Sequence, residues 1–180
     1  MVKIIIGLTG EMASGKTTGA KYLQKKYSAT IYRFSDILKG TLQRLHKQNN
    51  RKNLQEVSTM FRTVFGEDAL AKAIAEDVRA DNNKIVAVDG VRRLGDIEHL
   101  KKIEGFRLVY METDLEICHQ RISQRNEKID DQGKTLSEFK KDRQREAEQQ
   151  IRGLKKFSDF VIDNNGTLEE LHEQIDKLVK

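Results

Sequence analysis

The sequence of 180 residues contains no proline and only one cysteine. About nine prolines would be expected at the usual frequency of roughly 5%. Their absence excludes proline-rich linkers, polyproline ligands and a native cis-proline switch. Cys118 has no partner for an internal disulfide, which favours a reducing, cytoplasmic location. No apolar run approaches the roughly 18–20 residues of a membrane span, and the apolar stretch at residues 2–8 ends in glycine rather than at a signal-peptide cleavage site.

A large excess of charge of one sign is also missing. The chain carries 33 Lys and Arg residues against 28 Asp and Glu residues, a net charge of +5. This modest excess suits a phosphate-rich ligand. It would also suit nucleic acid, but no long basic run or basic–aromatic stripe supports that partner. With 37% hydrophobic and 34% charged residues, the composition is typical of a soluble globular protein with one substantial core.

Apolar residues follow two different periods along the chain. Short apolar runs predict strands at residues 2–8, 30–34, 84–89, 106–111 and 160–162. Helical spacing predicts helices at about 15–27, 36–46, 54–65, 69–78, 96–103, 115–125, 137–156 and 167–180. Ser35 is the expected cap of the second helix. Strands that alternate with helices predict a five-stranded parallel sheet with helices on both faces, in a single domain over residues 1–180.

The strongest motif is Gly10-Glu-Met-Ala-Ser-Gly-Lys-Thr17, between the first predicted strand and the first predicted helix. It matches the phosphate-binding pattern G-x-x-x-x-G-K-[ST]. The glycines let the backbone wrap closely, so that N–H groups of the loop and of the helix N-terminus point at phosphate oxygens. Lys16 can neutralise the β- and γ-phosphates, and Thr17 can offer its hydroxyl to Mg²⁺. The motif therefore predicts binding of ATP and Mg²⁺ by Gly10, Ala13, Ser14, Gly15, Lys16, Thr17 and Thr18.

Two absent motifs narrow the class of nucleotide-binding protein. A GTPase should carry a base-reading N-K-x-D segment, but Asn83-Lys84-Ile85-Val86 lacks the acid and lies at the start of a predicted strand. Motor-type ATPases usually have an apolar strand that ends in Asp-Glu, whereas residues 85–88 lead into Asp89-Gly90. A small chain without either motif, but with an arginine-bearing polar segment, favours phosphoryl transfer to a small molecule.

Acidic and basic side chains follow two other predicted strands. Asp89 and Arg92 lie at the edge where open parallel sheets bind ligands. Asp89 could orient the Mg²⁺ shell, and Arg92 or Arg93 could hold an acceptor phosphate. Asp36 could accept a proton from an acceptor hydroxyl, although an acid in a first helical turn also stabilises the helix by itself. Further candidates for contacts with acceptor phosphates are Lys39, Arg44 and Arg62.

Arginines flank a polar segment in the second half of the chain. Arg121 and Arg125 are four residues apart and therefore share one face of a predicted helix. They lead into residues 126–137, a predicted mobile loop, and Arg143 and Arg145 lie beyond it. Such arginines could close over a triphosphate and neutralise charge as it moves, and a solvated helix surface is the alternative. The four histidines show no metal spacing, Cys118 is expected to be buried, and no nucleophile is assigned.

Together these motifs resemble those of the P-loop nucleoside-monophosphate-kinase superfamily over nearly the whole chain. Residues 5–17 and 159–170, at the two ends, are similar to dephospho-coenzyme A kinase. The middle lacks the Asp-x-Asp acceptor motif and the proline-containing segment of that family. It resembles instead an uncharacterised adenylate-kinase-related family of small nucleotide kinases, through residues 35–38, 61–71 and 88–92 and the pair Asp142-Arg143.

This resemblance implies a fold, a reaction and a set of site residues. The fold is a P-loop three-layer α/β/α sandwich with a helical acceptor-binding insert at about residues 36–80 and a short lid at about 121–145. The reaction is transfer of the γ-phosphoryl group of ATP to a nucleoside or deoxynucleoside monophosphate, or to dephospho-coenzyme A. The alternative is a nucleotide-binding regulatory or assembly ATPase without a small acceptor. The implied catalytic residues are Lys16, Asp36, Asp89, Arg92, Arg121 and Arg125, with Thr17 and Asp89 serving the metal.

The positions at which proline is missing are also informative. Typical adenylate kinases have one proline inside the phosphate loop and another before the acceptor-binding arginine. Here residues 11–13 and Val91-Arg92 fill those places. We therefore expect both loops to owe their shape to glycine, hydrogen bonds and bound phosphate.

Overall fold

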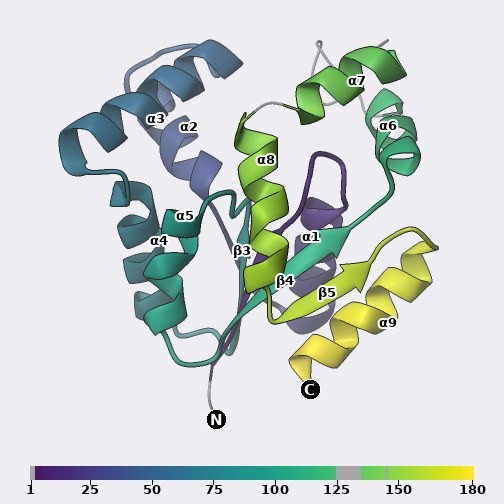
Figure 1. Cartoon of the computed structure of the whole chain (residues 1–180). Coiled ribbons are helices and arrows are strands. Elements are labelled where there is room, and N and C mark those ends of the chain that lie inside the picture. The colour runs from purple at the N-terminus through teal and green to yellow at the C-terminus, as the bar shows by residue number, and fades with distance from the viewer. Residues whose placement is uncertain (1–2, 125–134, 145) are drawn as a thin grey trace.

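The computed structural model describes residues 3–124, 135–144 and 146–180. Five strands form one parallel sheet in the order β2-β3-β1-β4-β5 (Figure 1). The predicted five-stranded parallel sheet is therefore confirmed. The strands are β1 (Ile4–Thr9), β2 (Thr30–Arg33), β3 (Ile85–Asp89), β4 (Phe106–Glu112) and β5 (Phe160–Asp163).

Helices cover both faces of the sheet (Figure 1). Helices α1 and α9 pack on one face, and α2, α4 and α5 pack on the other. Among the described residues, no helix is both long and apolar enough to cross a membrane. The helices are α1 (Lys16–Tyr27), α2 (Phe34–Arg44), α3 (Arg51–Phe65), α4 (Ala69–Ala80), α5 (Leu94–Glu98), α6 (Leu115–Ser123), α7 (Leu136–Arg143), α8 (Glu146–Gly153) and α9 (Leu168–Val179), with 3-10 turns at Leu100–Lys102 and Leu154–Phe157.

The central strand β1 explains why the sheet is buried on both faces. Its side chains alternate between two apolar clusters, so that Ile5 packs with α2, α4 and α5 while Ile6 and Leu8 pack with α1 and α9. A strand covered on both faces reads as a continuous apolar run, as residues 4–8 do. Because β1 and β2 both pair in parallel with β3, their carboxyl ends lie at one edge of the sheet: Leu8 and Arg33 are both in register with Asp89.

A smaller third cluster joins the phosphate loop to the helices beyond β4. Ala13 of the loop packs with Cys118 and Ile122 of α6 and with Phe139 of α7. The predicted burial of Cys118 is confirmed, because its exposed fraction is 0%. Burial raises the pKa of its thiol to about 11, so the sulfur stays protonated and inert at neutral pH.

Several predicted element boundaries are wrong. A single helix over residues 137–156 does not form: α7 ends at Arg143, α8 covers Glu146–Gly153, and a 3-10 turn follows. The break lets Phe139 pack against α6 while Leu154 packs against the sheet, which one straight helix could not do. The helix predicted at 96–103 is likewise a short α5 followed by a separate 3-10 turn. Ser35 is not a cap, because α2 already starts at Phe34, whose ring is buried in the core.

The insert predicted at about residues 36–80 corresponds to α2, α3 and α4, which lie together on one side of the molecule (Figure 1). In the lid predicted at about 121–145, the described parts are the end of α6 and helix α7. Residues 125–134 and 145 lie outside the described residues, and with them most of the predicted mobile loop, Arg125 and Arg145.

A polar cluster fastens α9 to α1 and gives the fold a testable acid sensitivity. Lys26, Tyr22 and Tyr27 donate hydrogen bonds of 2.6, 2.8 and 2.8 Å to the Asp176 carboxylate. The bond from Lys26 is the main reason that the pKa of Asp176 falls from 3.8 to about 2. A lowered folded-state pKa stabilises the fold above the unfolded value, and that stabilisation is lost as the pH falls through the folded value.

We therefore expect an Asp176→Asn variant to be less stable than the wild type above about pH 4, the ordinary titration range of a carboxyl group. The difference should shrink as the pH falls from about 4 to about 2, because the wild-type carboxylate is then protonated. Urea unfolding at a series of pH values measures this. A difference that is constant across the range would mean that the charge of Asp176 contributes nothing.

Candidate active site

The phosphate loop connects β1 to α1 through an unusual backbone path. Gly10, Ala13 and Gly15 have φ angles of 142°, 62° and 96°. A Cβ atom on Gly10 would lie 2.5 Å from the Met111 carbonyl oxygen, and one on Gly15 would lie 2.1 Å from Asn164 Nδ2. Both positions therefore require glycine, for the backbone conformation and for the close approach of neighbouring chain. The loop is wedged between β4 and the turn that follows β5.

Lys16 begins α1 and folds back over its own loop. Its Nζ donates hydrogen bonds of 2.6 Å to the Gly10 carbonyl and 2.7 Å to the Glu11 carbonyl. Burial lowers the pKa of this ammonium to about 8, and the nearby Asp89 carboxylate opposes part of that shift. A partly buried ammonium that has no direct carboxylate partner among the described contacts is well suited to gain a phosphate as its counter-charge.

Thr17 and Asp89 come together as the sequence predicts. Thr17 Oγ1 donates to Asp89 Oδ2 over 3.1 Å, and the Asp89 side chain is 7% exposed. A hydroxyl beside a carboxylate at a phosphate loop is the oxygen donor set that Mg²⁺ prefers, so these residues fit the ion. No group of three or more His, Cys, Asp or Glu side chains in the described ranges is arranged to hold a metal. The fit therefore depends on phosphate oxygens for the remaining ligands.

Arg33 is a site residue that the sequence analysis missed. Its Nε donates to Asp89 Oδ2 over 3.2 Å, the same oxygen that accepts from Thr17. Its NH1 lies 3.9 Å from Asp36, which also pairs with Lys39 at 3.2 Å. Asp36 is half exposed, in the first turn of α2. The one available signal was position, because Arg33 ends the strand that pairs with β3.

Asp96 organises the loop that carries Arg92 and was also missed. Its Oδ2 accepts 3.0 Å hydrogen bonds from the backbone N–H groups of Arg92 and Arg93, and its Oδ1 lies 3.7 Å from Arg62 NH2. The Asp96 residue is 3% exposed and the Arg62 side chain 13%. The carboxylate thus fixes the backbone before α5 and holds Arg62 of α3 beside it, while the Arg92 side chain remains exposed.

We expect Asp96→Ala to destabilise the fold by about 2–4 kcal/mol, because it leaves two backbone donors without their acceptor and leaves the largely buried Arg62 guanidinium with Glu67 alone. Asp96→Asn is the matched variant: it keeps an oxygen for the backbone donors but loses the charge, so it should cost roughly half as much. Urea unfolding with unchanged m-values would measure both. An alanine variant within about 0.5 kcal/mol of the wild type would contradict this account of the loop.

Arg121 of α6 reaches the phosphate loop indirectly. Its NH2 donates over 3.0 Å to the carbonyl of Asn164, whose side-chain amide donates over 2.8 Å to the Ser14 carbonyl. Asn164 is 4% exposed and lies in the turn after β5. The sequence analysis had treated this asparagine only as a turn residue. The structure thus places Arg121 next to the loop, and the role predicted for Arg125 falls outside the described residues.

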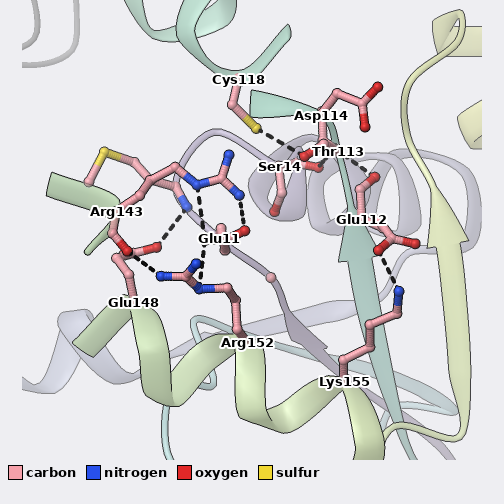
Figure 2. A network of polar contacts seen from close by, with 12 residues as sticks. Glu11, Ser14, Glu112, Thr113, Asp114, Cys118, Arg143, Glu148, Arg152 and Lys155 are labelled. Carbon is pink, nitrogen blue, oxygen red and sulfur yellow. Dashed lines mark hydrogen bonds and ion pairs between the residues drawn. The ribbon is translucent and has the colours of Figure 1, made fainter. Parts of the chain in front are cut away.

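A network of acids and arginines lies on the other flank of the loop. Arg143 of α7 forms a bidentate pair with Glu11, and Arg152 of α8 lies 3.4 Å from the same carboxylate (Figure 2). Glu148 accepts a 3.2 Å hydrogen bond from the Met12 N–H. A cavity of about 450 Å³ lies beside this network, with a lining that includes Glu11, Ser14, Thr113, Lys140, Arg143 and Arg152. The sequence analysis singled out only Arg143 of the network.

Comparison with known proteins identifies a family whose model covers most residues of this site. The model of the AAA_17 family, described as an AAA domain, matches residues 9–137, which include the phosphate loop, Asp89 and Arg121. The chain belongs to this family. This AAA_17 chain is also 29% identical to a UPF0200 protein of Sulfurisphaera tokodaii, over 98% of this chain and 96% of that protein. It is 27% identical to a UPF0200 protein of Thermococcus kodakarensis, over 98% and 96% of the two chains.

Among solved structures, the AAA_17 chain resembles a shikimate kinase from Bacteroides thetaiotaomicron. The TM-score is 0.65 and the identity 16%, over 97% of this chain and 96% of that chain. At this identity the likeness concerns the fold alone, which is the P-loop kinase fold. The predicted P-loop fold, a parallel sheet between layers of helices, is therefore confirmed. The similarity of the two ends to dephospho-coenzyme A kinase stays a prediction.

Proposed function

We propose that this protein is an ATP- and Mg²⁺-dependent kinase that transfers the γ-phosphoryl group to a small nucleotide-like acceptor, whose own phosphate is the nucleophile. A nucleoside or deoxynucleoside monophosphate has this chemistry. The observation that supports the proposal most is the group of ion pairs around Arg33. There Asp89 and Asp36, the two acids that the sequence offers as candidate base or metal ligand, both face cations.

The pairing of these acids favours a phosphate nucleophile over a hydroxyl. A hydroxyl acceptor needs a carboxylate with an oxygen free to take its proton, and both carboxylates here are already engaged by neighbouring donors. Asp89 accepts from both Thr17 and Arg33, and Asp36 pairs with Lys39. A phosphate nucleophile needs no base. Its oxygen bonds to the γ-phosphorus as the bond to the β,γ-bridging oxygen breaks, which gives a diphosphate and ADP.

The proposed roles follow from where the side chains lie. The loop N–H groups and Lys16 bind the triphosphate, and Thr17 and Asp89 hold Mg²⁺, which when bound neutralises charge on the β- and γ-phosphates. We assign the phosphate of the acceptor to the exposed Arg92, whose backbone N–H bonds to Asp96, and to Arg62, whose guanidinium lies 3.7 Å from the same carboxylate. Arg121 approaches the loop from α6. Catalysis then rests on position and charge neutralisation, without a covalent intermediate.

The discriminating experiment is a coupled assay of ADP release with ATP, Mg²⁺ and a panel of acceptors. We expect stimulation by at least one nucleoside or deoxynucleoside monophosphate and none by dephospho-coenzyme A. Stimulation by dephospho-coenzyme A alone would contradict the phosphate nucleophile. ADP release that no acceptor stimulates would favour the regulatory ATPase instead.

A further inference from the structure

Two carboxylates link the phosphate loop to the helices beside it. Glu11, the second residue of the loop motif, turns its side chain toward α7 and α8, and two guanidinium groups converge on it (Figure 2). Glu148 of α8 accepts a hydrogen bond from the N–H of Met12 in the loop. Both carboxylates thus engage donors of the kind that bind phosphate oxygens, a loop N–H group and guanidinium groups.

The ion pair between Glu11 and Arg143, which we call the tie, is largely buried. Arg143 Nε donates to Glu11 Oε1 over 3.0 Å, its NH2 pairs with Oε2, and the two side chains are 11% and 10% exposed. Arg152 reinforces the tie from α8, because its NH2 donates over 2.6 Å to the Arg143 carbonyl. One carboxylate in the phosphate loop therefore holds the end of α7 and the body of α8.

Two cations converge on one carboxylate in the tie, because Arg143 and Arg152 both pair with Glu11. Burial lowers the pKa of the Arg143 guanidinium, and the neighbouring charge of Arg152 lowers it further. Arg143 NH1 is buried and, within the described residues, has no hydrogen-bond partner. A triphosphate beside the loop would supply an acceptor for this group and a second anion for the two arginines.

We propose that Glu11 is a positioning residue that holds Arg143 beside the phosphate loop and competes with the triphosphate for it. This inference rests on the proposed function only in that ATP must bind the loop. When the triphosphate enters, Arg143 exchanges a carboxylate for phosphate oxygens, and the end of α7 follows it toward the nucleotide. Glu11 thus keeps the arginine close and correctly oriented, at the cost of a weaker apparent affinity for ATP.

Direct ATP·Mg²⁺ titration by calorimetry, without any acceptor, tests this through a double-mutant cycle. Glu11→Gln should bind ATP about tenfold more tightly than the wild type, because a neutral amide holds the guanidinium less strongly. In an Arg143→Met background the same change should tighten binding by roughly threefold at most, through the loss of simple charge repulsion alone. The ratio of these two fold-changes in ATP affinity measures the coupling between Glu11 and Arg143, which we assign to the tie.

Glu76→Gln is the matched control, since Glu76 also pairs with a basic side chain, Arg79, but on the exposed surface of α4. It should change ATP affinity by less than about twofold. Equal tightening in both backgrounds, or no tightening by Glu11→Gln, would overturn the proposal while leaving the kinase intact. A wild-type protein that binds no ATP would overturn both. Thermal unfolding of each variant shows that the comparison is made between folded proteins.

Discussion

Replacing Lys16 by methionine should reduce phosphoryl transfer by about 10³-fold, the typical loss when one charge-stabilising donor is removed. Lys16 is the cation that already lies over the loop, within 2.7 Å of two of its carbonyls. No other lysine donates to the loop carbonyls among the described contacts. Steady-state rates of ADP formation at saturating ATP and acceptor measure this effect.

Lys25→Met is the matched control for the Lys16 variant. Lys25 lies on the same helix but is exposed in its last turn, so its loss should change the rate by less than about twofold. Lys16→Met should remain folded, because methionine keeps most of the apolar stem of the lysine. A folded Lys16→Met variant with near-wild-type turnover would contradict the placement of the triphosphate.

Replacing Asp89 by asparagine should lower kcat by about 10²-fold and raise the Mg²⁺ concentration needed for half-maximal rate. The change removes the negative charge beside Thr17 and leaves Arg33 with only the longer, 3.9 Å pair to Asp36. Rates measured across a Mg²⁺ titration separate the effect on metal use from the effect on turnover. An unchanged Mg²⁺ requirement would mean that Asp89 does not serve the metal.

Asp36→Asn is the matched variant for Asp89→Asn, because it removes the other candidate acid. Asp36 is half exposed and pairs with Lys39, and a phosphate nucleophile needs no base from it. We therefore expect a loss of less than about tenfold, mainly in the KM of the acceptor. If Asp36→Asn removed as much kcat as Asp89→Asn, a hydroxyl acceptor with Asp36 as base would be the better account.

The parts of the site that depend on local sequence could be predicted without the structure. The phosphate loop follows directly from glycine spacing between a strand and a helix, and both glycines have the positive φ angles that the motif needs. Asp89 could be placed because it ends a buried strand, and Thr17 lies 3.1 Å from it. The parallel sheet followed from the alternation of strands and helices.

The site residues that the sequence did not reveal owe their roles to contacts between segments that are far apart in the sequence. Glu11 looked like a variable position of the loop, and its role appears only once α7 and α8 fold against it. Asp96 and Arg62 meet across two helices, and Asn164 reaches Ser14 from the far end of the chain. No local pattern encodes such pairs. The break between α7 and α8 was missed for the same reason, because it depends on where Phe139 and Leu154 pack.

The absence of proline has a structural counterpart in both loops. In the phosphate loop, Ala13 adopts the left-handed conformation with a φ of 62°, a backbone position unavailable to proline. In the other loop, Val91 is fully buried and its carbonyl accepts a 2.9 Å hydrogen bond from Thr9 Oγ1. Packing and hydrogen bonds thus shape these turns where adenylate kinases have proline. That the loops loosen in the empty site stays a prediction.

The fate of the γ-phosphoryl group tests the central claim most directly. With ATP labelled at the γ-phosphorus, Mg²⁺ and the acceptor that stimulates turnover, the label should appear in the terminal phosphate of a nucleoside diphosphate. Formation of that product should be lost in Lys16→Met and kept in Lys25→Met. Label recovered in a sugar phosphate ester would contradict the phosphate nucleophile, and label recovered only as inorganic phosphate would contradict the kinase.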